Sequence, residues 1–284
     1  IAECWPVEDA IVRSTSQNGA GFDATQNDGL RDAIRSAIGQ TSQGAAAFVD
    51  MERIAREIVS PVLNDTWRAI QCTENHDIVR NGRGLRIPRI ADSSNSHSWY
   101  ARSRSRVALG LVLTSAGIPH LFMGQEFLED KQWHDEPNSP FQISWDGLNQ
   151  GNKPMVDYLR FTREIIESRS RLKGLRGSGI NIFHVHNNNR VLAFHRWVPG
   201  EGHDVIVVAS LNDSTHFNYA LGFPRNGYWK EEFNSDVYDT WVNPGVVGNG
   251  GGIDVNGSGM HGLPFSALIT IPANSIVILS RSWN

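Results

Sequence analysis

The stretch WRAIQCTENHD, residues 67–77, joins a short apolar run to a group of polar side chains. The apolar run has the length of a buried strand, and Glu-Asn-His-Asp follows it directly at residues 74–77. In α/β proteins, binding and catalytic groups gather at the carboxyl ends of parallel strands. The stretch therefore predicts either reactive chemistry or a buried polar cluster at a strand end.

Short apolar runs alternate with helical patterns on both sides of this stretch, up to residue 176. Strands are expected within IAECW at 1–5, NGAGFDATQ at 18–26, DTWRAIQCTENHD at 65–77 and IPHLFMGQEF at 118–127. Helices are expected within 27–40, 48–59, 98–117 and 153–175, and Ser98 is expected to cap the third of them. Such alternation predicts a parallel sheet or barrel, with polar residues at the strand ends.

The pattern changes at RGSG, residues 176–179, and becomes a series of short alternating strands separated by turns. The expected strands lie at 181–186, 190–197, 204–212, 217–223, 228–235, 267–272 and 275–281. The glycine-rich segment 243–262 has no periodicity and is expected to be a loop. These features predict an α/β domain over 1–176 and an all-β sandwich over 177–284.

The composition argues against several classes of function. A formal net charge of −4 offers no basic surface for nucleic acid or membrane, and no apolar run reaches the ~18 residues of a transmembrane helix. Cys4 and Cys72 lie in strand-like runs and are expected to be buried thiols, which favours a reducing, cytoplasmic compartment. Because the chain opens inside an apolar run without a Met, it is expected to be a piece of a longer polypeptide.

Two carboxylates at predicted strand ends suit glycosidic bond chemistry, which needs one protonated and one ionised carboxyl group. Glu3 lies among apolar residues next to Trp5, where an apolar wall would favour the protonated form. Asp77 follows His76 in a polar segment that would keep it ionised. From residue types alone, both carboxylates could instead be structural hydrogen-bond acceptors.

Ordered motifs along the chain resemble the α-amylase superfamily (glycoside hydrolase family 13). CTENHD resembles the signature of the seventh barrel strand, IAECWP that of the fifth and AGIPHLFMGQEF that of the eighth. The segments 98–130, 190–197 and 231–241 are most similar to 1,4-α-glucan branching enzymes. The resemblance implies the C-terminal half of a (β/α)₈ TIM barrel, strands 5–8, followed by the sandwich.

The same resemblance implies a role for each residue of the candidate site. Glu3 would be the general acid/base, and Asp77 the carboxylate that stabilises the transition state. His76 would donate a hydrogen bond to the bound sugar, and Trp5 would stack on a sugar ring or wall the site. Asn75 would shape the strand end and, with His76 and Trp5, belong to the substrate-binding residues.

The nucleophile of the family lies on the fourth barrel strand, so no residue of this chain is assigned that role. DGLRD at 28–32 imitates its motif, but Arg31 and Asp32 are adjacent and open a helix. Asp32 is therefore expected to be a helix-surface charge. GFDATQNDGLRDAI at 21–34 instead resembles the sixth-strand region of branching enzymes and trehalose-releasing relatives.

Other polar residues are expected to be structural, and neither a metal nor a cofactor is expected. Glu74, Gln125 and Glu126 would anchor the strand ends. His184, His186 and His195 have no zinc-like spacing and no carboxylate partner in the sequence, so they are expected to be polar packing. Arg102, Arg104 and Arg106 alternate along a helix and are expected to be surface or loop-anchoring charges.

The activity expected from the resemblance is 1,4-α-glucan branching, in which an α-1,4 link is cleaved with retention and passed to a 6-hydroxyl. The alternatives are amylase-like or trehalose-releasing hydrolysis, and a non-catalytic glucan-binding fragment. The expected partners are an α-glucan and the missing N-terminal half of the same polypeptide, with no nucleic acid or membrane. This chain alone is expected to be inactive.

Overall fold

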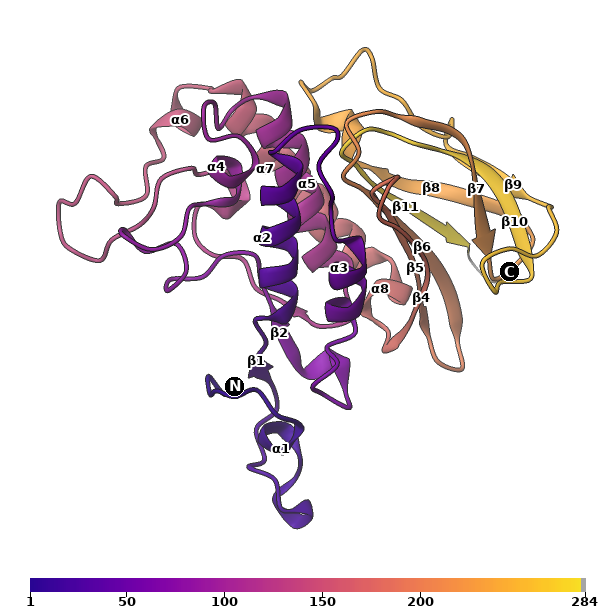
Figure 1. The fold of residues 1–284 in the computed structure, drawn as a ribbon, viewed down its shortest axis with the longest axis horizontal. Coiled ribbons are helices and arrows are strands. Elements are labelled where there is room, and N and C mark those ends of the chain that lie inside the picture. The colour runs from indigo at the N-terminus through magenta and orange to yellow at the C-terminus, as the bar shows by residue number, and fades with distance from the viewer. Residues whose placement is uncertain (282–284) are drawn as a thin grey trace.

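The N-terminal part of the protein is built on three short parallel strands. The computed structural model describes residues 1–281 (Figure 1). The strands β1 (Thr25–Gln26), β2 (Ala69–Gln71) and β3 (Ile118–Pro119) lie side by side in sequence order. Thr25 pairs with Ala69, and Ile70 pairs with Ile118. An isolated parallel bridge between Ala2 and Thr25 extends the array beyond β1.

Two of the expected strands are much shorter than the sequence suggested. In the first run only Ala2 pairs, whereas Glu3, Cys4 and Trp5 are exposed and leave the sheet before Pro6, which cannot donate a ladder hydrogen bond. In IPHLFMGQEF, pairing ends after the His120 amide, which donates to the Gln71 carbonyl. The expectation of a buried Cys4 is therefore wrong.

The expected helices are present. The main helices are α2 (Gly29–Thr41), α3 (Met51–Ile58), α4 (Ile87–Ala91), α5 (Trp99–Thr114) and α7 (Lys153–Arg171). The short helices are α1 (Asp9–Val12), α6 (Asp146–Asn149), α8 (Lys173–Arg176), η1 (Thr15–Gln17), η2 (Thr66–Arg68), η3 (Gln125–Phe127) and η4 (Ser235–Tyr238). The predicted cap is confirmed, because the Ser98 hydroxyl accepts from the Ala101 amide at 3.1 Å. Within residues 1–281, no helix has both the length and the apolar character needed to cross a membrane.

The C-terminal part is a sandwich of two antiparallel sheets. The six-stranded sheet has the order β4 (Gly179–His186), β5 (Val191–Val198), β6 (Gly202–Ser210), β11 (Ile276–Arg281), β8 (Gly227–Asn234) and β9 (Gly252–Val255). The second sheet pairs β7 (His216–Phe223) with β10 (Phe265–Ile271). All seven expected strands are present. β9 lies inside the segment expected to be a loop, because four residues paired with β8 are too few to create a visible period.

The central strands β5, β6 and β11 of the six-stranded sheet are buried on both faces. Leu192 and Phe194 of β5 join one core cluster with α2, α3, α5 and α7, whereas Val191 and Ala193 join a second cluster under β7 and β10. Burial on both faces explains the continuous apolar runs of β5 and β6. The helices therefore share a hydrophobic core with the sandwich (Figure 1).

Arginines of α5 join the helix layer to loops of the sandwich. Arg102 contacts Asp239 at 2.7 Å, and Arg104 contacts Asp213 at 3.1 Å. Arg106 is 2 % exposed and lies 3.8 Å from Asp239. The expectation of surface charges is therefore wrong, because the sandwich covers this helix, but the loop-anchoring alternative is confirmed.

Arg196 of β5 lies at the junction between the two parts. It is fully buried and donates to the backbone carbonyls of Thr114, Leu175, Gly177 and Gly179. These carbonyls lie at the ends of α5 and α8 and at the start of β4, where helices and strands leave acceptors unpaired. One side chain thus supplies hydrogen-bond donors to four backbone carbonyls at the junction between the helices and the sandwich.

Replacing Arg196 by Leu should destabilise the whole protein, because four buried carbonyls lose their donor. We expect the free energy of unfolding to fall by about 3 kcal/mol or more. Urea denaturation of Arg196→Leu measures the change. The control Arg163→Leu changes an exposed residue of α7 and should shift the free energy by less than ~0.5 kcal/mol. Equal effects of the two substitutions would contradict this role for Arg196.

Candidate active site

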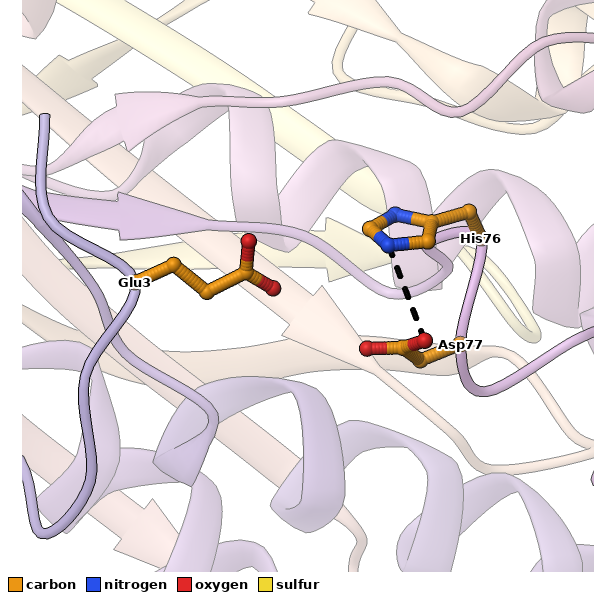
Figure 2. Close-up of side chains that lie close together, drawn as sticks. All are labelled: Glu3, His76 and Asp77. Carbon is orange, nitrogen blue, oxygen red and sulfur yellow. Dashed lines mark ion pairs between the residues drawn. The ribbon is translucent and has the colours of Figure 1, made fainter.

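Glu3, His76 and Asp77 come together at the carboxyl ends of the parallel strands. Their nearest carboxylate and imidazole atoms all lie within 4.8 Å of one another (Figure 2). His76 Nε2 lies 3.6 Å from Asp77 Oδ1. Glu3 reaches the pair from a different segment of the chain. The Ala2–Thr25 bridge places residues 1–5 beside β1, and β1 in turn pairs with β2. The geometry brings together two carboxylates and an imidazole from strand ends.

This cluster is open to solvent in residues 1–281. The side chains of His76 and Asp77 are 54 % and 69 % exposed, and Glu3 is also exposed. Trp5 is 52 % exposed and donates its indole N–H to Asp28 Oδ2 at 3.2 Å. The apolar enclosure expected around Glu3 is therefore not formed by this part of the chain.

Glu74 and Asn75 are buried and hold the strand end in shape. Glu74 is 1 % exposed, contacts Arg86 Nη1 at 2.9 Å and accepts from the Ile87 amide at 2.7 Å. The Asn75 side chain accepts from the Ile78 amide at 2.9 Å and so closes the turn formed by residues 75–78. These contacts fit the shaping role for both residues, whereas direct contact of Asn75 with a sugar stays a prediction.

Gln125 ties η3 to the end of β2. Its side-chain amide donates to the Thr73 hydroxyl, directly before Glu74. This contact confirms the structural role expected for Gln125, and the same role for Glu126 stays a prediction. Cys72, one residue earlier, is buried, and burial raises the pKa of its thiol to about 12. A Cys72 thiolate therefore has no part in chemistry near neutral pH.

His120 is a residue near the site that the sequence analysis missed. It follows β3 directly, as the ENHD segment follows β2. Burial and the neighbouring His76 both lower its pKa, and its Nδ1 atom is buried without a hydrogen-bond partner among residues 1–281. The signal that could have identified it is its position at a strand end beside the already recognised motif.

Asp32 is a helix-surface charge, as expected. Its side chain on α2 is 47 % exposed and contacts Arg31 Nε at 2.9 Å. Arg31 also contacts Asp28 at 2.7 Å, and Asp28 accepts from Trp5. The start of α2 therefore positions the tryptophan, and the absence of a nucleophile at Asp32 stays a prediction.

The three histidines of β4 and β5 pack with polar neighbours in the sandwich. The His184 ring stacks on His261 at 4.1 Å and lies 2.7 Å from the Tyr219 hydroxyl. His195 contacts Asp204 at 2.8 Å. The expectation that these histidines lack a carboxylate partner is wrong for His195, because β6 returns antiparallel beside β5.

Comparison with known proteins defines the class of this fold. Residues 182–282 match the family model described as "Alpha amylase, C-terminal all-beta domain". The pullulanase of Anoxybacillus sp. LM18-11, solved with maltotetraose, has a similar fold, with a TM-score of 0.63 and 18 % identity. That match covers 95 % of this chain and 36 % of the pullulanase chain.

Curated relatives of the chain are branching enzymes, and the chain is similar to the α-amylase family. It is 30 % identical over 210 residues to "1,4-alpha-glucan branching enzyme GlgB" of Mycobacterium tuberculosis (strain ATCC 25618 / H37Rv), covering 72 % of this chain and 27 % of the relative. It is 24 % identical over 297 residues to "1,4-alpha-glucan branching enzyme GlgB 1" of Xanthomonas campestris pv. campestris (strain 8004), covering 97 % and 36 %. The chain thus spans less than two thirds of the length of these relatives. The resemblance inferred from the sequence is confirmed.

The folding stability should fall between pH 6.5 and about 4 because of His184. Burial is the first cause, and His261 and His186 the next, that lower the pKa of His184 from 6.5 to about 4. The unfolded chain therefore binds a proton in this window that the folded chain rejects, so stability is lost as the pH falls. Urea denaturation at several pH values measures the slope.

The variant His184→Phe should flatten this slope, since it removes the titrating group. The control His186→Gln changes an exposed histidine of the same strand and should leave most of the slope. An unchanged slope in His184→Phe would contradict the assignment.

Proposed function

We propose that the protein takes part in 1,4-α-glucan branching by retaining cleavage of an α-1,4 link and transfer to a 6-hydroxyl. The meeting of Glu3, His76 and Asp77 at the strand ends is the observation that carries this proposal. The names of its branching-enzyme relatives support the choice of substrate and reaction. An α-glucan is therefore the proposed partner.

In this proposal the three residues divide the chemistry. Glu3 protonates the leaving glycosidic oxygen and later removes the proton from the incoming 6-hydroxyl. Asp77 stabilises the positive charge that develops on the sugar ring, and His76 donates a hydrogen bond to a sugar hydroxyl. Trp5 walls the site or stacks on a sugar ring. No metal or cofactor enters these steps.

The architecture proposed for the active molecule is larger than this chain. Residues 1–176 are proposed to form strands 5–8 of a (β/α)₈ barrel, and residues 177–284 the all-β domain. The parallel order of Ala2, β1, β2 and β3 supports this assignment. The nucleophilic carboxylate would come from an earlier part of a longer polypeptide, so this chain alone is proposed to be inactive.

Hydrolysis is the second candidate, and the exposure of the site favours it. His76 and Asp77 are 54 % and 69 % exposed, so water reaches the position where a 6-hydroxyl must attack. Iodine staining of amylose separates the two reactions. Branching lowers the absorbance without new reducing ends, whereas hydrolysis produces reducing ends. Glucan binding with neither a fall in absorbance nor new reducing ends would indicate the third alternative, a non-catalytic glucan-binding fragment.

The variant Glu3→Gln should slow glucan cleavage by a factor of roughly 10² to 10⁴, because the amide cannot donate a proton to the leaving oxygen. The rate should be measured on the polypeptide that carries the complete barrel. An activated substrate such as a maltosyl fluoride needs little acid assistance, so its first step should be far less affected. Equal losses on both substrates would exclude the acid role, and Glu8→Gln at an exposed neighbour is the matched control.

The variant Asp77→Asn should lower kcat by orders of magnitude even with a maltosyl fluoride, because it removes the charge that stabilises the transition state. Glucan affinity should stay within about tenfold, and the melting temperature should change little, since the Asp77 side chain is 69 % exposed. The exposed Asp254→Asn is the control. A large loss of stability with kcat intact would identify the residue as structural.

A further inference from the structure

We propose that Trp133 and Arg86 are positioning residues that fix the backbone around His76 and Asp77. This inference rests on the proposed function of these two residues. Neither Trp133 nor Arg86 reaches the cluster with its own charged or polar group. Both act instead through the chain that carries His76 and Asp77.

Trp133 holds the segment after β2 on both sides of Asp77. Its indole N–H donates to the His76 carbonyl at 2.6 Å. Its backbone amide donates to the Val79 carbonyl at 3.1 Å, and its carbonyl accepts from the Asn81 amide at 2.9 Å. One residue of the segment after η3 thus fixes three points of the strand-end loop.

Arg86 fixes the same segment through Glu74, the residue that precedes Asn75 and His76. Its guanidinium and the Glu74 carboxylate are each 1 % exposed and lie 2.9 Å apart. Arg86 also donates to the Lys131 carbonyl at 2.7 Å and to the Met123 carbonyl at 3.0 Å. A buried ion pair with further hydrogen bonds is rigid, because breaking it leaves an unpaired charge in the interior.

Phe122 connects the two positioning residues. The Arg86 guanidinium lies 5.2 Å from the centre of the Phe122 ring. The Trp133 ring meets Phe122 edge to face, with the centres 5.7 Å apart. Contacts therefore run without a break from Glu74 through Arg86, Phe122 and Trp133 to the His76 carbonyl.

This support matters because the two site side chains have little support of their own. Within residues 1–281, their one ion pair or hydrogen bond is the 3.6 Å contact between His76 Nε2 and Asp77 Oδ1. Their direction toward Glu3 is therefore set by the backbone that carries them (Figure 2). A displacement of about 1 Å at a catalytic group can cost about 100-fold in rate.

The variant Trp133→Phe tests the proposal, because it keeps a ring against Phe122 but removes the donor to His76. In the polypeptide with the complete barrel, kcat for glucan cleavage should fall roughly 10- to 100-fold, with KM within about threefold. The melting temperature should stay close to that of the parent. The control Trp145→Phe changes a half-exposed indole that packs on Phe127 and should leave kcat unchanged.

A folded Trp133→Phe with unchanged kcat would overturn the proposal. If Trp133→Phe instead melts at a lower temperature, Arg86→Lys is the deciding variant, because it keeps the buried charge but loses the forked hydrogen bonds. A loss of kcat larger than the loss of folded protein would support the positioning role. A kcat per folded molecule equal to that of the parent would overturn it.

A second readout separates this inference from the proposed function. If the parent shows no glucan chemistry, the proposed function fails, and the imidazole NMR signals of His76 still report its position. One sharp set of signals in the parent and broadened or doubled signals in Trp133→Phe would support positioning. Identical signals in both would overturn it.

Discussion

Burial of helix α5 on every side is the constraint on which the rest of the structure depends. Every residue from Ser103 to Thr114 is buried, so the helix needs partners all round. The sandwich provides one face, and the approach is so close that a Cβ at Gly110 would lie 2.5 Å from Ile276 of β11. The all-β part and the α/β part therefore share one hydrophobic core, with α5 packed between them.

The same helix leads into β3 and so helps to set the edge at which the candidate site lies. β3 pairs with β2, and the His76 and Asp77 side chains project beyond β2 into solvent. Their backbone is held by buried groups, above all Glu74 with Arg86. A rigid backbone that carries exposed charged side chains suits a site that must bind a hydroxyl-rich substrate in a fixed orientation.

Local features of this fold could be predicted from the sequence, but most long-range partners could not. The Ser98 cap and the alternating strands depend on neighbouring residues, and they are confirmed. The burial of Arg104 against Asp213 depends on residues far along the chain, and sequence spacing gave no sign of it. For the site, the residue types suggested carboxylate chemistry, but the hydrogen bond from Trp133 to His76 joins segments that only the fold brings together.

We propose that the strand-end cluster binds an α-glucan. Titration of the isotope-labelled polypeptide that carries the complete barrel with maltoheptaose, followed by NMR, tests this proposal. We expect the side-chain signals of Glu3, His76 and Asp77 to shift together and saturate at millimolar sugar, while those of the buried Arg196 do not move. Saturable shifts confined to the sandwich, or no shifts at all, would contradict it.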